Sequence, residues 1–436
     1  MKEGTYKVKF LSDEYTCMYV KDTEVLKRIV TQLKVQPRET WGIDTETAAY
    51  DEFKDTVKPA LNPHYSYVRL IQIFTGRTVI VFDMQEDREA KQQIVKSLLE
   101  AKKWVGHNSI FDLQYFYNLF KIRYMDIGCT LLAAKLVFHA LSPTDAGLSA
   151  SLRNLVNILF KAEILKEVQN SDWSKPDLTW EQVEYSALDA IGTYKIAEKL
   201  GAKLQKLDLL GIYNLYKEAQ HPLCKMQLTG IKLDIEPHKK MIAKWEADAQ
   251  QAEKELLEIT KLNKITTTTI SNYLEKNLDE DTKESWPKSE KTGRLQTDSN
   301  AFVLYSHLPI VKPFSKYQKA TKLYSSFGIG LAEMVNRVTG RLHPRYNIAG
   351  ARTGRLSCTN PNNQQCPRDK AFRSLYIPEP GNVFVVADYS QIEVRVMAEY
   401  SQDPQMLKVY REGKDIYRYT AAHLNSIREE DVTKDQ

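Results

Sequence analysis

Residues 41–47 read WGIDTET, a short apolar run that ends in two acids separated by one residue. Side chains two positions apart in a β-strand project from the same face, so we expect Asp44 and Glu46 to lie side by side. Two neighbouring carboxylates repel each other unless a cation lies between them, which makes this pair a candidate site for a divalent metal. Taken alone, such a pair more commonly belongs to an ordinary surface strand.

Two later stretches each add an acid that fits the same site. Residues 105–112 read VGHNSIFD, in which an apolar strand leads into a helix and Asp112 lies one turn inside it. Residues 185–189 read YSALD, and because side chains four positions apart share one helical face, Tyr185 and Asp189 can reach a common site. Read separately, Asp112 fits a cap-like structural acid and Tyr185 an ordinary half-buried aromatic, so the combination carries the prediction.

The three motifs, in this order, resemble those of the DEDDy 3′–5′ exonucleases, the proofreading family. The resemblance implies two Mg²⁺ ions, with Mn²⁺ as a substitute, held by the carboxylates of Asp44, Glu46, Asp112 and Asp189. It implies that Tyr185 orients the attacking water and that the substrate is a frayed single-stranded 3′ end. Asn108 is expected to support the site and contact DNA, and His107 fits either the same supporting role or a purely structural one.

A second constellation lies near the C-terminus, where residues 383–387 are an apolar run predicted to form a strand that ends in Asp388. Asp388 either holds a metal or caps the helix that follows. Residues 388–395, DYSQIEVR, closely resemble motif A of family A DNA polymerases. The resemblance implies that Asp388 and the backbone of Tyr389 bind the catalytic metal, and that Glu393 selects deoxyribonucleotides.

Stretches before motif A extend this resemblance. Residues 351–357, ARTGRLS, resemble the TGRLS segment of the family, which implies that Arg355 contacts the primer backbone through forked hydrogen bonds. Residues 361–367, PNNQQCP, resemble the family's PNLQNIP with three departures, and Gln364 keeps its place as an expected DNA contact.

The stretch at residues 218–234 resembles the start of the polymerase thumb, and a basic stripe follows it. The stripe consists of Lys316, Lys319 and Lys322, which recur at three-residue steps. Such a stripe is suited to the phosphates of duplex DNA, and a solvated helix surface is the ordinary alternative.

The predicted fold class is α/β, with a ribonuclease-H-like exonuclease domain, a mainly helical thumb and the start of a polymerase palm. The corresponding boundaries are 1–205, 206–339 and 340–436. The periodicity predicts strands at residues 41–45, 67–74, 78–83 and 104–106, and helices at residues 111–119, 180–200 and 235–262. The polar composition of residues 279–297 predicts a loop or a mobile tip.

The composition and net charge are compatible with an enzyme that acts on nucleic acid, but they do not by themselves indicate one. The 436 residues carry a net charge of +5, which fits local basic patches but also many other enzymes. The five cysteines form no CxxC pair, so we do not expect a zinc site. We expect them to be free thiols in a reducing compartment. With no apolar run long enough to span a membrane, we expect a cytoplasmic protein, in the host cytoplasm if it is viral.

No stretch of the chain resembles polymerase motifs B and C, which supply the cations that grip the triphosphate and the second metal-binding aspartate. We therefore expect the chain to be a portion of a family A replicative polymerase that proofreads by itself. We expect it to use dNTPs on a primer-template only when a second polypeptide supplies the fingers and the rest of the palm. A phage-type split gene is favoured over a splicing precursor or a truncation. The alternatives are an exonuclease-only enzyme and a DNA-binding clamp with a vestigial polymerase half.

Overall fold

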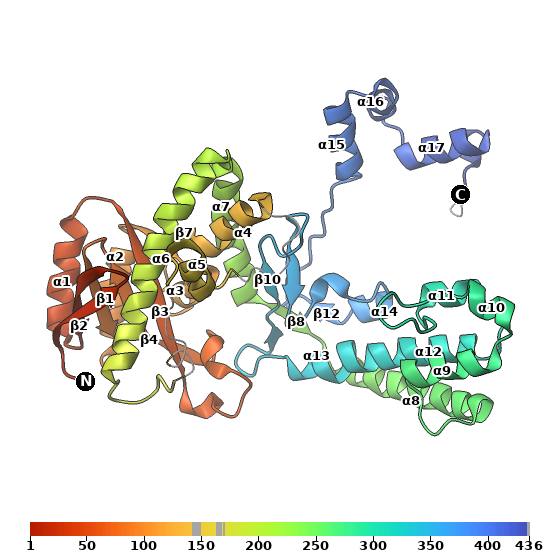
Figure 1. Cartoon of the computed structure of the whole chain (residues 1–436), viewed down its shortest axis with the longest axis horizontal. Coiled ribbons are helices and arrows are strands. Elements are labelled where there is room, and N and C mark those ends of the chain that lie inside the picture. Colours follow the sequence, from red (N-terminus) through yellow and green to blue (C-terminus); the bar gives the residue numbers. More distant parts are fainter. Residues whose placement is uncertain (142–149, 163–167, 169–170, 434–436) are drawn as a thin grey trace. The chain divides into compact units, whose positions relative to one another are not determined.

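The computed structural model describes residues 1–141, 150–162, 168 and 171–433, and within them a seven-stranded sheet organises the N-terminal part (Figure 1). Strands β1 and β4 run antiparallel to the other five. In sheet order, the strands are β1 (Gly4–Phe10), β2 (Asp13–Val20), β5 (Thr78–Asp83), β4 (Ser66–Phe74), β3 (Thr40–Ala49), β6 (Lys103–Gly106) and β7 (Asp126–Cys129).

Helices cover both faces of this sheet, because alternate strand residues are apolar on each side. Leu70 and Phe74 of β4 pack in one buried cluster, whereas Ile71 and Ile73 pack in the other. The first cluster is shared with α4 (Thr130–Leu141), α5 (Leu152–Phe160) and α6 (Trp180–Lys206), and the second with α1 (Thr23–Val35), α2 (Arg88–Leu99) and α3 (Ile110–Asn118).

The long helix α6 crosses one face of the sheet (Figure 1). It begins with a capping box, in which the backbone N–H of Gln182 donates to the Thr179 hydroxyl and the backbone N–H of Thr179 donates to the Gln182 side chain. These bonds satisfy N–H groups that the first turn leaves without partners. The box therefore fixes the residue at which the helix begins.

The predicted strands and helices of this part are confirmed, but β1 and β2 escape prediction. In β1 the buried Val8 and Phe10 alternate with exposed lysines, and in β2 the buried Tyr15 and Cys17 alternate with half-buried residues. Such alternation is the pattern of a half-buried strand. The strands pair through the tight connection between Phe10 and Asp13.

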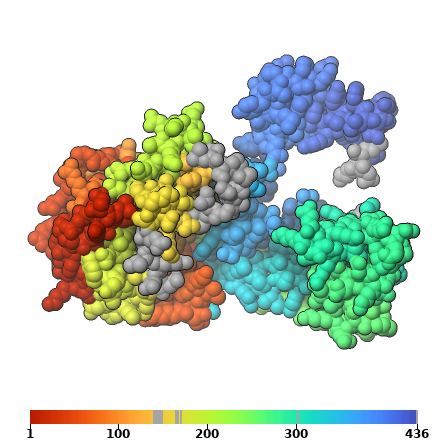
Figure 2. Space-filling model, viewed as in Figure 1, coloured from red at the N-terminus to blue at the C-terminus, as the bar shows by residue number. Residues whose placement is uncertain are grey.

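Helices dominate residues 206–335, as predicted. Helix α8 packs along α12, and the helices from α8 to α13 form one continuous block, coloured green to cyan in the space-filling view (Figure 2). The elements are α7 (Leu210–Thr229), β8 (Ile231–Leu233), α8 (Ile235–Thr260), α9 (Thr267–Asn277), α10 (Glu280–Ser285), α11 (Ser299–Val303), α12 (Val311–Lys322), η3 (Leu323–Ile329) and α13 (Gly330–Glu333).

The prediction of a loop or mobile tip at residues 279–297 is wrong in part. Asp279 caps α10 by accepting from the Thr282 N–H, at 2.8 Å. The Trp286 side chain is buried and stacks on Tyr305 with ring centroids 4.1 Å apart. One buried indole outweighs the polar composition around it, because burying a tryptophan removes a large apolar surface from water.

Short strands follow the helices in the first compact unit, Met1–Ile377. Strands β12 (Tyr376–Ile377), β8 and β9 (Arg341–Leu342) form one sheet, and β10 (Arg345–Asn347) pairs with β11 (Ser357–Thr359). The remaining short elements are η1 (Asp51–Phe53), η2 (Pro59–Leu61), η4 (Asn363–Gln365) and α14 (Lys370–Arg373).

The second compact unit, Pro378–Gln436, does not contain the expected strand at residues 383–387. Val385 and Val386 are 90% and 91% exposed, and no described residue pairs with this run. The prediction is wrong because a strand needs a hydrogen-bonded neighbour and a buried face, neither of which the described residues supply. The unit's helical elements are α15 (Ile392–Ser401), α16 (Pro404–Arg411), α17 (Ile416–Asn425) and η5 (Glu429–Asp431).

None of the helices within the described residues combines the length and the apolar character needed to cross a membrane.

Candidate active site

The candidate site begins with the acid pair on β3. Asp44 lies opposite Gln72 of β4, and Glu46 lies opposite Leu70, with a register shift directly after Glu46. Both acids are half-buried, and the intervening Thr45 is buried. Strand alternation therefore places the two carboxylates on one face, as predicted.

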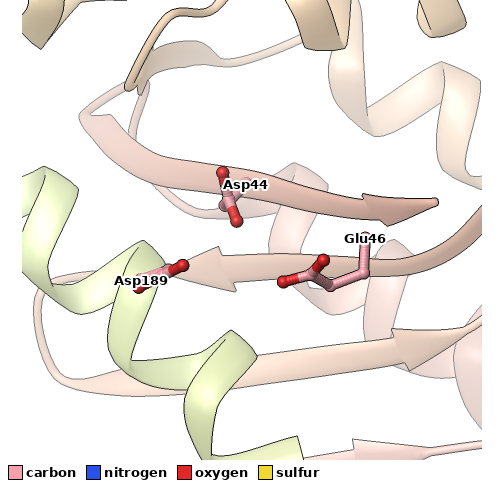
Figure 3. A group of neighbouring side chains, drawn as sticks. All are labelled: Asp44, Glu46 and Asp189. Carbon is pink, nitrogen blue, oxygen red and sulfur yellow. The ribbon is translucent and has the colours of Figure 1, made fainter. Parts of the chain in front are cut away.

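Helix α6 adds a third carboxylate to this face. The carboxylate oxygens of Asp44, Glu46 and Asp189 lie within 4.8 Å of one another. Figure 3 shows the two strand acids and the helix acid pointing toward a common centre. Of the acids and histidines predicted for the exonuclease site, these three form the tightest group within the described residues.

Gly42 explains how α6 approaches the strand so closely. A Cβ atom at this position would lie 2.6 Å from the carbonyl oxygen of Ala190, the residue after Asp189. Only glycine leaves room for helix backbone at that distance. Gly42 therefore sets the spacing between β3 and α6 that allows Asp189 to reach the strand acids.

Asp112 approaches from the first turn of α3 and is buried. Its carboxylate accepts a hydrogen bond of 2.6 Å from the Thr45 hydroxyl. Asp112 does not belong to the tight group of three, but its charge lies close enough to raise the pKa of both Asp44 and Glu46. The structure thus brings all four predicted carboxylates into one neighbourhood.

Ionisation of all four carboxyl groups at once is unfavourable in this neighbourhood. Burial first, and then the charges of neighbouring carboxylates, raise the pKa values of Asp44 and Glu46 well above their usual range. Burial raises the pKa values of Asp112 and Asp189 to about 7. Divalent cations relieve such repulsion, and hard cations such as Mg²⁺ prefer carboxylate oxygens. The donor set therefore fits a Mg²⁺ or Mn²⁺ site.

Tyr185 lies one helical turn before Asp189 on α6 and is half-buried. Burial, followed by the charges of Asp189 and Glu46, raises the pKa of its hydroxyl, so the phenol stays protonated at neutral pH. The ring lies beside the buried Trp173, with centroids 6.5 Å apart. A protonated hydroxyl at the edge of the acid cluster can hydrogen-bond a water or a phosphate oxygen.

The turn between β6 and α3 carries the remaining predicted residues. Burial lowers the pKa of His107 to about 4, and its Nδ1 lies 2.9 Å from the Thr130 hydroxyl, which favours the structural interpretation of this histidine. Asn108 is exposed and left-handed, with φ of 57°. Asparagine tolerates such a conformation, and the side chain is accessible to solvent.

The predicted basic stripe lies on α12, where Lys316, Lys319 and Lys322 are exposed. Two of them line a cleft of about 910 Å³ between α8, α12 and residues 367–372. Lys244 and Arg368 add positive charge to this cleft, while acids also line it. The cleft is therefore mixed in charge, with a cation on each of its three walls.

Arg355 and Gln364 lie on the same segment of the first unit. Both are exposed, and the Gln364 side-chain amide donates to the Leu356 carbonyl oxygen at 3.3 Å. This bond ties η4 to the residue after Arg355. The two predicted DNA contacts are thus held together by local structure.

The motif A residues are exposed in the second unit. Asp388, Tyr389 and Glu393 all lie at its surface, and Tyr389 is 80% exposed. Because residues 383–387 do not form a strand, Asp388 does not lie at the mouth of a buried strand as expected. Among the described residues, no cluster of three metal-ligating side chains includes Asp388.

Comparisons with known proteins agree with this arrangement. Residues 17–205 match the family described as 3′-5′ exonuclease, and residues 236–436 match the family described as DNA polymerase family A. DNA polymerase I of Aquifex aeolicus is 28% identical over 439 residues, which cover 96% of this chain and 69% of that protein. The thermostable DNA polymerase I of Thermus thermophilus is 34% identical over 232 residues, which span 50% of this chain and 27% of that protein.

A solved structure shares the fold. The POL domain of Pol1 from M. smegmatis, in complex with DNA primer-template and dNTP, superposes with a TM-score of 0.73 at 21% identity, covering 96% of this chain and 68% of that one. Together the two family matches leave only short segments of the chain uncovered. The chain thus carries a 3′–5′ exonuclease domain ahead of a region that matches DNA polymerase family A, and each of the two matches spans a little under half of the chain.

Proposed function

We propose that the domain at residues 1–205 removes nucleotides from single-stranded 3′ ends of DNA and thereby proofreads. The observation that carries the proposal is the convergence of Asp44, Glu46 and Asp189 within 4.8 Å, beside a protonated Tyr185, in a segment that matches the exonuclease family. Four desolvated carboxylates destabilise the domain unless cations neutralise them. Such an arrangement is typical of a metal-dependent site and not of a structural one.

The residues divide the work of hydrolysis. Asp44, Glu46, Asp112 and Asp189 would hold two Mg²⁺ or Mn²⁺ ions, which supply Lewis-acid stabilisation of the charge that develops on the phosphate. The Tyr185 hydroxyl would hydrogen-bond the attacking water and hold it in line with the phosphorus. The Thr45 hydroxyl fixes one oxygen of Asp112 and so keeps that carboxylate turned to the site. Asn108 would contact the DNA strand.

We further propose that the helical region at 206–339 and the segment at 340–436 act in DNA synthesis. Lys316, Lys319 and Lys322 would neutralise duplex phosphates, and Arg355 and Gln364 would contact the primer-template, which the M. smegmatis relative binds. In this proposal Asp388 and the Tyr389 backbone bind a catalytic metal, and Glu393 excludes ribonucleotides. Synthesis from dNTPs also requires the residues of motifs B and C, which no stretch of residues 1–436 resembles.

A 5′-labelled primer-template, incubated with the chain and Mg²⁺ with and without dNTPs, tests both parts. We expect the primer to shorten in both conditions, because the exonuclease site needs no further residues. Extension by the chain alone would contradict the requirement for motifs B and C. An unchanged primer in both conditions would favour the second candidate, a DNA-binding clamp, for which the cationic walls of the α8–α12 cleft provide the support.

A further inference from the structure

A β-bulge lies beside the acid pair, and its extra residue is an arginine. Glu46 pairs with Leu70 and Thr47 pairs with Val68, so Arg69 of β4 is left without a partner residue on β3. Val68 and Leu70 are two residues apart and would share a face in a regular strand, but Leu70 packs in the cluster on the α6 side of the sheet and Val68 packs in the cluster on the other side. Bulges of this kind redirect side chains and occur often beside active sites.

The Arg69 side chain is fully buried and held by three acceptors. Its guanidinium donates to the Asp83 carboxylate at 3.0 Å and to the carbonyl oxygens of Lys175 at 2.7 Å and Pro176 at 3.1 Å. Tyr19 also donates its hydroxyl to Asp83. The ion pair neutralises the arginine, so Arg69 does not act as a charge on the acid cluster.

The two carbonyls belong to residues 171–179, the segment that leads into α6. The Gln182 side chain ties the segment's start to the helix by donating to the Ser171 hydroxyl at 2.9 Å and to the Asp172 carbonyl at 3.2 Å. Trp173 of this segment is buried and lies beside the Tyr185 ring. Arg69 therefore holds the backbone of the segment whose indole packs against the phenol.

We propose that Arg69 is a positioning residue for Tyr185. The planar guanidinium holds the backbone carbonyl groups of Lys175 and Pro176 in place. Because Trp173 belongs to the same segment, its indole is held as well. The indole then limits where the Tyr185 ring can lie. The proposal rests on the proposed exonuclease function. It assigns Arg69 to the attack step and not to DNA binding, because none of its partners lies among the predicted DNA contacts.

The test uses Arg69→Lys, which keeps a buried positive charge for Asp83 but removes the rigid fork that reaches two carbonyls. On a single-stranded oligonucleotide with Mg²⁺, we expect kcat to fall about tenfold and KM to stay within about twofold, since small misplacements near the chemistry lower kcat. In a Tyr185→Phe background, we expect Arg69→Lys to change kcat by less than about twofold, because the hydroxyl it positions is already gone.

A matched control is Lys102→Met. Lys102 is likewise a buried cation whose amino group donates to backbone carbonyl oxygens, those of Gln36 and Pro37, but it is tied to a different segment. We expect this change to lower the melting temperature without lowering kcat. If Arg69→Lys fails to fold, Trp173→Leu takes its place, with the same decrease in kcat expected and the same absence of a further decrease in the Tyr185→Phe background.

The outcomes separate this inference from the proposed function. A wild-type chain that does not digest DNA overturns the proposed function. If the wild type digests DNA, the inference is overturned when Arg69→Lys keeps the wild-type kcat, when it slows the Tyr185→Phe chain as much as the wild type, or when Tyr185→Phe itself has no effect.

Discussion

The two regions that resemble catalytic motifs differ in how much of a site each assembles. On β3 and α6, three carboxylates converge within 4.8 Å, and a fourth lies close enough to raise the pKa of two of them. Around Asp388 the side chains are exposed, and no described cluster of metal ligands includes it. Both regions carry a recognisable acid motif. The difference shows that a motif becomes a site only where the surrounding fold brings partners from other segments.

Removing the acids in each region tests this comparison most strongly. We expect Asp44→Ala combined with Glu46→Ala to lower Mg²⁺-dependent digestion at least about 1000-fold, because metal ions supply several kcal/mol of transition-state stabilisation. Asp388→Ala is the matched control and leaves digestion unchanged. Oligonucleotide binding by the double variant, measured by fluorescence anisotropy, stays near wild type. Digestion that survives in the double variant would show that the acids are misassigned.

Gly42→Ala tests whether the close approach of α6 builds the first site. The new methyl group collides with the Ala190 carbonyl and pushes Asp189 away from the strand acids. We expect digestion to fall about tenfold to a hundredfold, the decrease typical of a displacement of about 1 Å, and the melting temperature to fall.

Gly201→Ala, also on α6, is the control for that change, because nothing lies within 4 Å of a Cβ atom there. We expect it to raise the melting temperature slightly and to leave digestion unchanged, since alanine favours a helix over glycine. Equal activity of the two variants would mean that the glycine at position 42 does not set the site.

Variants of the lysine stripe separate the affinity for duplex DNA from digestion at the acid cluster. Replacing Lys316, Lys319 and Lys322 with glutamine should weaken duplex binding about tenfold and reduce the slope of log affinity against log salt by about 2.7, near 0.9 for each phosphate that a lysine no longer neutralises. Anisotropy titrations at several salt concentrations measure both quantities. Digestion of a short single strand should not change.

Charge removal elsewhere provides the control for the stripe. Lys2, Lys9 and Lys34 are also exposed but lie on β1, α1 or the chain's first residues. Replacing these three with glutamine alters net charge equally. If both triple variants show the same decrease in affinity, the stripe is an ordinary solvated surface.

The smallest expected effect concerns stability without metal. A carboxyl whose pKa is raised on folding contributes stability that is present below its unfolded pKa and is lost as the pH rises through its folded pKa. For Asp112 and Asp189 that folded value is about 7. In EDTA the melting temperature should therefore fall by a few degrees between pH 5 and pH 8.

Mg²⁺ should restore the melting temperature at pH 8 and change it little at pH 5. Asp44→Asn removes one of the repelling charges, so we expect the metal-free variant to melt above the wild type at pH 8. Calorimetry in EDTA and in Mg²⁺ measures both effects. A wild-type melting temperature that is the same at both pH values in EDTA would contradict the repulsion described for this cluster.

Local periodicity predicted the strand with Asp44 and Glu46, the turn before Asp112 and the helix with Tyr185 and Asp189, because each depends on short-range pattern. Gly42, Thr45 and Arg69 were not predicted as parts of the site. Their importance comes from contacts with segments distant in sequence, for which one chain gives little signal beyond a glycine inside a strand.

Long-range pairing also explains the errors in the fold. The apolar residues 383–387 have the composition of a strand, yet a strand forms only with a partner, and the described residues provide none. At residues 279–297 the polar composition concealed the buried Trp286. Pattern predicts which elements are possible, whereas tertiary contacts decide which of them form.

The most direct test of the account is a crystal of the chain grown with Mn²⁺, with anomalous diffraction recorded at the manganese edge. We expect an anomalous peak in contact with the carboxylates of Asp44, Glu46 and Asp189, and its disappearance in the Asp44→Ala, Glu46→Ala variant. Well-ordered carboxylates without any manganese among them would contradict the assignment of this cluster as the metal centre of the exonuclease.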